Sequence, residues 1–125
     1  MNASTEQLRR WIPRILALIL AAFLGLFSMD VFSEGYSPLE AAGAFLVHSI
    51  PSLLILVGLA IAWRHERAGG LLFLALGAVA VFRFRGLPAF VIVALPAFLV
   101  GILFLLASTA STPTPPFAGT RSPDQ

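Results

Sequence analysis

The sequence predicts an all-α protein, a bundle of four transmembrane helices in up-down antiparallel order. Apolar residues make up 58% of the 125 residues and charged residues only 11%, against about 25% charged residues in a typical soluble domain. Four apolar runs fill most of the chain: Ile15–Phe32, Leu39–Trp63, Ala68–Phe82 and Leu87–Ala107. About 20 apolar helical residues cross a bilayer core about 30 Å thick, so each run is a candidate span.

These runs divide the chain into a cytoplasmic N-terminal segment (residues 1–11), a transmembrane domain (12–107) and a disordered C-terminal tail (108–125). Ser4 and Gln7 have the spacing of a capping box, which predicts a short interfacial helix beginning there. The tail is rich in Ser, Thr and Pro and lacks the apolar residues needed to fold.

The first run is expected to be a retained helix. Pro13 suits its first turn, where a missing N–H costs nothing. Ala17, Ala21 and Gly25 form a stripe of small residues at four-residue spacing, where a neighbouring helix can approach closely. The arginines before this run imitate a secretory signal, but no Ala-x-Ala-like cleavage site follows it.

The remaining runs differ in length and in their breaks. Gly35 and Pro38 separate the first two runs, and the second, at about 25 residues, is expected to tilt or to emerge from the hydrocarbon. The third, about 15 residues before Arg83, spans only if that side chain reaches outward to the headgroups. The alternative is a re-entrant hairpin of runs three and four. Pro88 suits the first turn of the fourth run, and Pro96 predicts a bend within it.

Charge predicts that both termini face the cytoplasm. All eight basic residues are arginines, and this orientation places six of them inside and only Arg83 and Arg85 outside, as the positive-inside tendency requires. Asp30, Glu34 and Glu40 gather on the outer side. The Lys-free composition, rich in Ala, Leu, Gly and Arg, suggests a bacterial genome and hence a multi-pass protein of the bacterial inner membrane.

Four polar residues form the candidate functional locus: Asp30, His48, Ser52 and Arg83. A charged side chain at the bilayer centre costs about 2.5–3.5 kcal/mol on insertion scales, so each ionisable residue there needs an explanation. His48 is expected to be the deepest, about 12 Å along a helix that starts near Glu40. Ser52 follows one turn later on the same face.

The roles of these residues stay open at this level. His48 is either a proton-relay or ligand group, or a neutral imidazole bonded to another helix; Pro51 frees the carbonyl of Val47 nearby. Asp30 either approaches His48, directly or through water, or ends its own helix in the headgroup zone. Arg83 is expected to reach lipid phosphates rather than line an anion path, and pairing with an acid on the same side is an alternative.

Several functions lack the residues they need. Without Cys there is no disulfide, thiolate nucleophile or Cys-based metal site. His65 lies in a charged turn on the side opposite to His48, so neither a bis-His haem nor a His-based metal site is expected. Ser49 and Ser52 form no recognisable triad, and no basic run longer than two residues indicates nucleic-acid binding. We therefore expect a non-enzyme without cofactor or metal, in contact with the bilayer and with a second copy or another membrane protein.

The order of short motifs carries a resemblance. The motifs are Arg14-Ile15-Leu16-Ala17, Met29-Asp30-Val31-Phe32, His48-Ser49-Ile50-Pro51-Ser52, Ala62-Trp63-Arg64 and Gly69-Gly70-Leu71-Leu72-Phe73. Over roughly Trp11–Ala107 the chain resembles a family of small, uncharacterised bacterial membrane proteins known only as a domain of unknown function. The resemblance implies a four-helix membrane domain with Asp30 and His48–Pro51 as its polar marks, and it implies no activity.

Two better-known families of similar size fit less well. Small multidrug transporters carry a carboxylate midway along their first helix, and Ile15–Met29 contains none. Dual-topology fluoride channels carry a polar Gly/Arg/Asn signature that this sequence lacks. The expected role is therefore a structural or accessory membrane subunit, and the alternative is a small transporter or channel using Asp30 and His48 as intramembrane polar groups.

Overall fold

The computed structural model describes residues 2–110, and all regular structure within them is helical, as predicted. The elements in chain order are α1 (Ala3–Met29), the 3₁₀ turn η1 (Asp30–Ser33), α2 (Pro38–Arg64), α3 (Glu66–Arg83), α4 (Leu87–Ala89), the π-helical η2 (Phe90–Ala94) and α5 (Leu95–Thr109).

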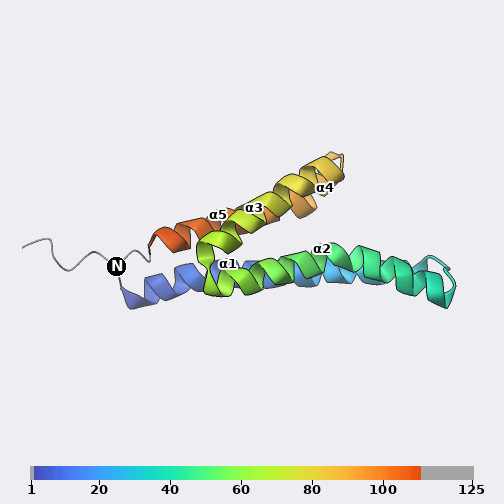
Figure 1. Cartoon of the computed structure of the whole chain (residues 1–125), viewed down its shortest axis with the longest axis horizontal. Helices are drawn as coiled ribbons and strands as arrows, with labels where there is room; N and C mark the ends of the chain where they lie inside the picture. The colour runs from blue at the N-terminus through green and yellow to red at the C-terminus, as the bar shows by residue number, and fades with distance from the viewer. Residues whose placement is uncertain (1, 111–125) are drawn as a thin grey trace, which may run out of the picture.

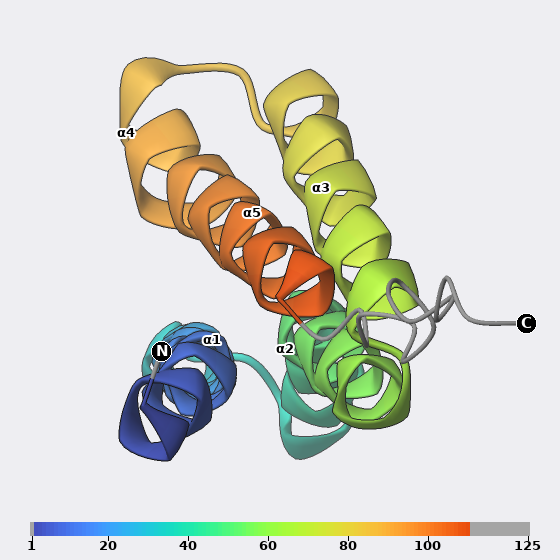
Figure 2. The ribbon, with the colours of Figure 1, turned by 90° about the vertical axis from the view of Figure 1, so that its left-hand side faces the viewer.

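The helices form two antiparallel hairpins (Figure 1). One hairpin pairs α1 with α2, and the other pairs α3 with the continuous helical segment α4–η2–α5. Each long helix packs mainly against two others, in the cyclic order α1, α2, α3, α5 (Figure 2). The hairpins meet at the end that holds the α2–α3 junction, here called the closed end. They diverge toward the α3–α4 link (Phe84–Gly86), here called the open end.

The first helix is longer than expected. A single helix runs from Ala3 to Met29, so the boundary after residue 11 falls inside it and Pro13 lies within it rather than in its first turn. Asn2 is the N-cap, without a side-chain cap bond, so the capping box expected at Ser4 is wrong. Good helix formers such as Gln7 precede the proline, and its missing N–H removes only one hydrogen bond.

The link between α1 and α2 follows the predicted break. Gly35 adopts a φ of 76°, a left-handed conformation that suits glycine. Ser37 and Glu40 form a capping box at the start of α2: the Glu40 carboxylate accepts hydrogen bonds from the Ser37 amide at 3.1 Å and from its hydroxyl at 2.7 Å. Glu34 raises the pKa of Tyr36 in this link, first by a side-chain hydrogen bond and then by its charge.

Small residues mediate the closest helix contacts. A Cβ added at Gly69 would overlap Ala62 on α2, and one added at Gly101 would lie 2.9 Å from the Gly70 carbonyl oxygen. The predicted stripe on α1 is also in contact, since Ala17 and Ala21 are buried. Small residues thus let the backbones approach where the sequence pattern indicated.

The fourth predicted span contains a π-helical turn next to Pro96, the residue at which a bend is predicted. The π-helical turn η2 directly precedes α5, and it contains the carbonyl of Ile92, which Pro96 cannot bond. The helix ends at Thr109, two residues beyond the expected boundary, so Ser108 is helical rather than part of a disordered tail. The hydroxyls of Ser108 and Thr109 donate hydrogen bonds to the backbone carbonyls three residues earlier, those of Leu105 and Leu106, and so add to the bonding of the last turn. The rest of the predicted tail, 111–125, lies outside the described residues.

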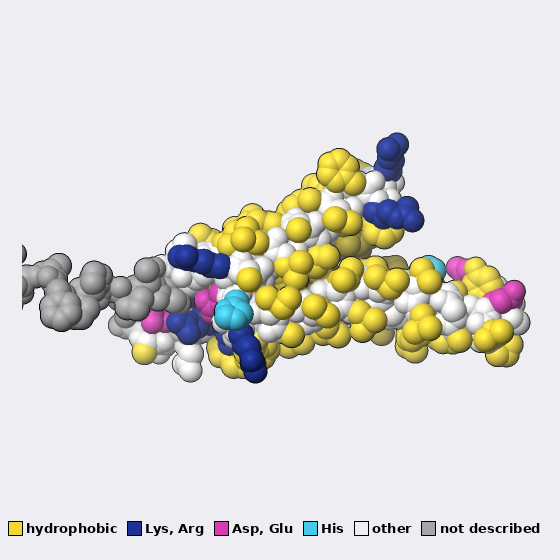
Figure 3. Space-filling view, in the orientation of Figure 1, with side chains coloured by type: hydrophobic (Ala, Val, Ile, Leu, Met, Phe, Trp, Pro, Cys, Tyr) yellow, Lys and Arg dark blue, Asp and Glu magenta, His cyan; other side chains and the backbone are white. Residues whose placement is uncertain are grey.

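The outer surface is strongly apolar (Figure 3). Leucine, isoleucine, valine and phenylalanine side chains are exposed along every long helix, while the buried core is small and centres on the stacked rings of Phe73 and Phe104, 5.7 Å apart. Within residues 2–110, three segments are long and apolar enough to cross a membrane: Ala3–Ser33, Pro38–Arg64 and Phe90–Thr109. The shorter α3 is charged at both ends, so three of the four predicted spans meet this criterion.

Candidate functional site

The divergence of the hairpins creates a cleft at the open end, here called the hairpin cleft. Its larger part, about 470 Å³, lies mainly between α2 and α3, and a smaller part of about 230 Å³ lies toward α1 and η2. The two parts share the lining residues Leu24, His48, Pro51, Phe84 and Val93. The volume falls in the range of about 300–1,000 Å³ typical of small-molecule sites, but the walls are almost wholly apolar.

His48 is one of the few polar side chains in the hairpin cleft. Its Nδ1 lies 2.8 Å from the carbonyl oxygen of Ala44, one turn earlier on α2. A carbonyl only accepts hydrogen bonds, so Nδ1 carries the proton and donates it. The side chain is exposed rather than bonded to a neighbouring helix.

Arg83 lines the same cleft from the end of α3. The alternative, an ion pair of Arg83 with Asp30, Glu34 or Glu40, is not formed, since both ion pairs between residues 2–110 involve the carboxylate of Glu66. His48 and Arg83 thus both line the hairpin cleft. If Arg83 lies at the headgroups, His48 lies near that level and not deep in the hydrocarbon as predicted.

Ser52 has a structural role. Its hydroxyl donates a hydrogen bond of 2.8 Å to the carbonyl oxygen of Ala21 on α1. Gly25 makes room beside it, because a Cβ there would lie 3.5 Å from the Ser52 hydroxyl oxygen. The bond joins the two helices of one hairpin, and Ser52 lines neither part of the hairpin cleft.

Asp30 is separate from these residues. It begins η1, where the Ser33 hydroxyl lies 2.6 Å from its backbone carbonyl oxygen and 3.2 Å from its carboxylate. Asp30 is absent from the lining of both parts of the cleft, and the described contacts of Asp30 and His48 do not join them. This arrangement matches the reading of Asp30 as a residue that ends its helix.

The closed end holds a cluster that the sequence analysis missed. The guanidinium of Arg14 lies 4.8 Å from the ring centre of Trp63 and 5.8 Å from that of Trp11, and the two indoles meet edge to face at 6.0 Å. The Oε1 atom of Glu66 forms ion pairs with Nη2 of Arg14 at 3.8 Å and with Nε of Arg10 at 4.0 Å. Helical spacing was the available signal: Trp11 and Arg14 are three residues apart and share a face.

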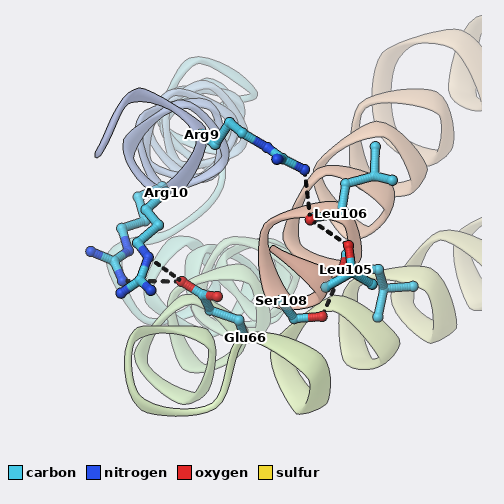
Figure 4. Close-up of polar contacts among 8 residues, drawn as sticks. Arg9, Arg10, Glu66, Leu105, Leu106 and Ser108 are labelled. Atoms are coloured by element: carbon cyan, nitrogen blue, oxygen red, sulfur yellow. Dashed lines mark hydrogen bonds and ion pairs between the residues drawn. The ribbon is translucent and has the colours of Figure 1, made fainter. Parts of the chain in front are cut away.

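A second contact at this end ties α1 to α5 (Figure 4). The Arg9 guanidinium donates a hydrogen bond of 3.1 Å to the carbonyl oxygen of Leu106, in the last turn of α5. A cation at a helix C-terminus is favourable, because the carbonyls there have no backbone N–H partners within the helix and carry partial negative charge. The N-terminal part of α1 therefore contacts all three other long helices.

Among residues 2–110, no group of three or more His, Asp or Glu side chains has the geometry to hold a metal ion.

The searches of curated proteins and of solved structures each returned no match. A family model described as a domain of unknown function (DUF7670) matches residues 1–114, more than the span of the motifs quoted above. The predicted kinship with an uncharacterised family is therefore confirmed: the chain belongs to the DUF7670 family.

Proposed function

We propose that this chain is an integral protein of a bacterial inner membrane, with four spanning helices and both ends in the cytoplasm, and that it acts as a structural or accessory subunit rather than an enzyme. The observation that carries the proposal is the apolar exterior. Large hydrophobic side chains cover the outside of all four long helices, far beyond the patches that soluble monomers expose. Lipid, or another membrane protein, is the medium that such a surface requires.

The length of α3 supports a fourth span. Its 18 residues measure about 27 Å at about 1.5 Å per residue, close to the thickness of the hydrocarbon core of about 30 Å. Its charges lie at its ends, where long side chains reach the headgroups. Its buried face packs along α5 and, near its start, against α2, which favours a crossing helix over a re-entrant hairpin.

Charge distribution supports the orientation. Six of the eight arginines lie at the closed end or in the tail that follows it, while the open end carries Arg83 and Arg85. With the closed end inside, the positive-inside tendency is satisfied. The α1–α2 hairpin is longer than α3: the 27 residues of α2 measure about 40 Å. Its tip, with Asp30 and Glu40, then projects about 13 Å beyond the level of Arg83 and offers a surface to a partner.

The topology is tested by labelling single cysteines, since the natural chain has none. Ser4→Cys, Tyr36→Cys, His65→Cys and Arg85→Cys are each treated with a membrane-impermeant maleimide on intact cells and after permeabilisation. We expect Tyr36→Cys and Arg85→Cys to react on intact cells, and the other two only after permeabilisation. External labelling of His65→Cys, or protection of Arg85→Cys, would overturn the four-span orientation. Release of the protein by alkaline carbonate would overturn membrane insertion itself.

A second candidate, a small transporter or channel, is favoured by the placement of His48. The residue lines an open cleft instead of being sealed in dry packing, although Asp30 does not join it there. A water-filled path predicts that His48→Cys reacts with a soluble maleimide in membranes and that His48→Ala changes solute flux in reconstituted vesicles. If His48→Cys reacts only with lipid-soluble reagents and flux is absent, this candidate fails and the accessory role stands.

A further inference from the structure

The closed end contains a second hollow, here called the basic hollow, of about 350 Å³. Among residues 2–110, its lining includes four arginines, one histidine and a single acid: Arg10, Arg14, Arg64, Arg67, His65 and Glu66. With His65 neutral, four positive charges and one negative charge leave a local charge of +3, more than the +2 of the whole chain. Such a concentration of like charge is costly unless an anion is nearby.

The single carboxylate does not serve all four cations. Glu66 lies between Arg10 and Arg14, while Arg64 and Arg67 form no ion pair between residues 2–110. Arg14 is also incompletely satisfied: its Nε is buried and has no hydrogen-bond acceptor in that part of the chain. The hollow therefore has donors in excess of the acceptors that residues 2–110 supply.

The start of α3 adds to this excess. His65 is the N-cap of α3 and provides no side-chain cap bond, so amides of the first turn lack side-chain acceptors. Glu66 and Arg67, the first residues of this 18-residue helix, both line the hollow. The partial positive charge at the start of α3 thus adds to the charge of the arginines at the hollow, an arrangement that favours anions.

The aromatic residues fix the level of the hollow. Trp11 and Trp63 pack beside Arg14, and tryptophan prefers the boundary between hydrocarbon and headgroups. Given the membrane placement proposed above, the basic hollow lies at the height of the lipid phosphates. Guanidinium groups bind phosphate oxygens in bidentate fashion, and basic pockets between membrane helices on the cytoplasmic side are suited to anionic headgroups.

We propose that the basic hollow binds the phosphodiester headgroup of an anionic membrane lipid. The guanidinium groups of Arg64 and Arg67 donate to the phosphate oxygens, and Arg14 contributes charge from the inner wall. The acyl chains lie along the exposed apolar surface of the helices. A free phosphate ion shares the charge chemistry but lacks the chains, so the lipid is expected to bind more tightly.

The test uses the full chain purified in an uncharged detergent. Its midpoint of thermal unfolding is measured during titration with short-chain phosphatidylglycerol, short-chain phosphatidylcholine or inorganic phosphate. Phosphatidylglycerol is expected to raise the midpoint in a saturable way, phosphatidylcholine to leave it unchanged, and phosphate to act only at much higher concentration. Equal effects of the two lipids would overturn the proposal, and equal effects of phosphatidylglycerol and phosphate would show a free-anion site instead.

Arg64→Gln/Arg67→Gln is the critical variant, because it leaves the Glu66 ion pairs in place. Its affinity for phosphatidylglycerol is expected to fall about tenfold or more, as for the loss of charge-assisted hydrogen bonds. Arg83→Gln/Arg85→Gln removes the same charge at the open end and should keep the affinity. An equal loss in both variants would reduce the effect to net charge and overturn the site. Should the double variant not fold, Arg64→Lys/Arg67→Lys keeps the charge without the bidentate geometry and must still lose affinity.

Membrane insertion and lipid binding can fail separately. If the topology experiment succeeds and the lipid titration shows no preference, only the lipid site is wrong. If the chain is released by alkaline carbonate, the membrane placement fails together with the argument for the level of the hollow.

Discussion

The two ends of the molecule contain the same four helices and differ in how closely they approach. At the closed end, glycine and alanine lie between the hairpins, as at Gly69 against Ala62, and α1 contacts all three other long helices. At the open end, large side chains such as Leu24, Phe84 and Val93 face the space between the hairpins. Side-chain size, more than overall hydrophobicity, thus determines where the helices join and where a cleft remains.

The largest effect is expected from Gly69→Ala, which disturbs the helix packing at the closed end directly. The new methyl group would overlap the backbone of Ala62, which cannot rotate away as a flexible side chain can. We expect a loss of about 3 kcal/mol in the free energy of unfolding, at the upper end of overpacking effects, measured by denaturant unfolding in detergent micelles.

Gly43→Ala is the matched control for this variant. Apart from its chain neighbours and the backbone of its own helix, no atom of the described residues lies within 4 Å of a Cβ built at Gly43. Alanine should therefore be neutral or stabilise α2 by about 0.5–1 kcal/mol. Equal destabilisation by both variants would mean that the closed end has no special role in holding the hairpins together.

A smaller effect is expected from Glu66→Gln, which removes the acid that Arg10 and Arg14 share. The side chain of Arg14 is only 13% exposed, so it would remain largely buried without an ion pair. The loss should be about 1–2 kcal/mol, below the 3–5 kcal/mol of fully buried pairs, because both pairs are long and the Arg10 side chain is half-exposed. Glu6→Gln, on an exposed part of α1, is the control and should have no effect in the same unfolding measurement.

One truncation made at both regions compares their packing directly. Val100 is 2% exposed in the core, whereas Val79 is 60% exposed beside the hairpin cleft. Val100→Ala should cost about 1 kcal/mol through the cavity it leaves, and Val79→Ala should stay within about 0.5 kcal/mol. Equal losses would indicate that the hairpins touch at Val79 and that the cleft closes in solution.

The sequence was sufficient for the features that depend on local pattern. The apolar runs predicted the four long helices, and the spacing of Ala17 and Ala21 predicted a close helix contact. Pro96 predicted a bend in the last helix, where the structure has the π-helical turn η2. The start of α1 was predicted too late, because a proline usually marks a first turn, and here Pro13 is accommodated inside a continuous helix.

The candidate site was harder to predict, because side-chain partners depend on how the hairpins pack. A contact between Asp30 and His48 was one of two alternatives, based on the expected pairing of their helices. In the structure Asp30 contacts Ser33 and His48 bonds its own helix. Arg83 and His48 line the same cleft, which lies where the hairpins diverge. The cluster around Arg14 needs Trp63 and Glu66, each of which is more than 45 positions away from Arg14 in the chain. No local periodicity in the sequence encodes that approach.

The smallest effect is expected from Ser52→Ala, within the α1–α2 hairpin. The variant removes the hydrogen bond to the Ala21 carbonyl, and such bonds between membrane helices average about 0.6 kcal/mol and reach about 1.7 kcal/mol. Ser49→Ala, for which residues 2–110 offer no hydrogen bond to another helix, should be neutral. Since Ser52 joins α1 to α2 and not one hairpin to the other, its loss should leave the labelling rate of His48→Cys unchanged. A faster rate would show that the hairpin bends as the cleft opens, so that the two ends would not be independent.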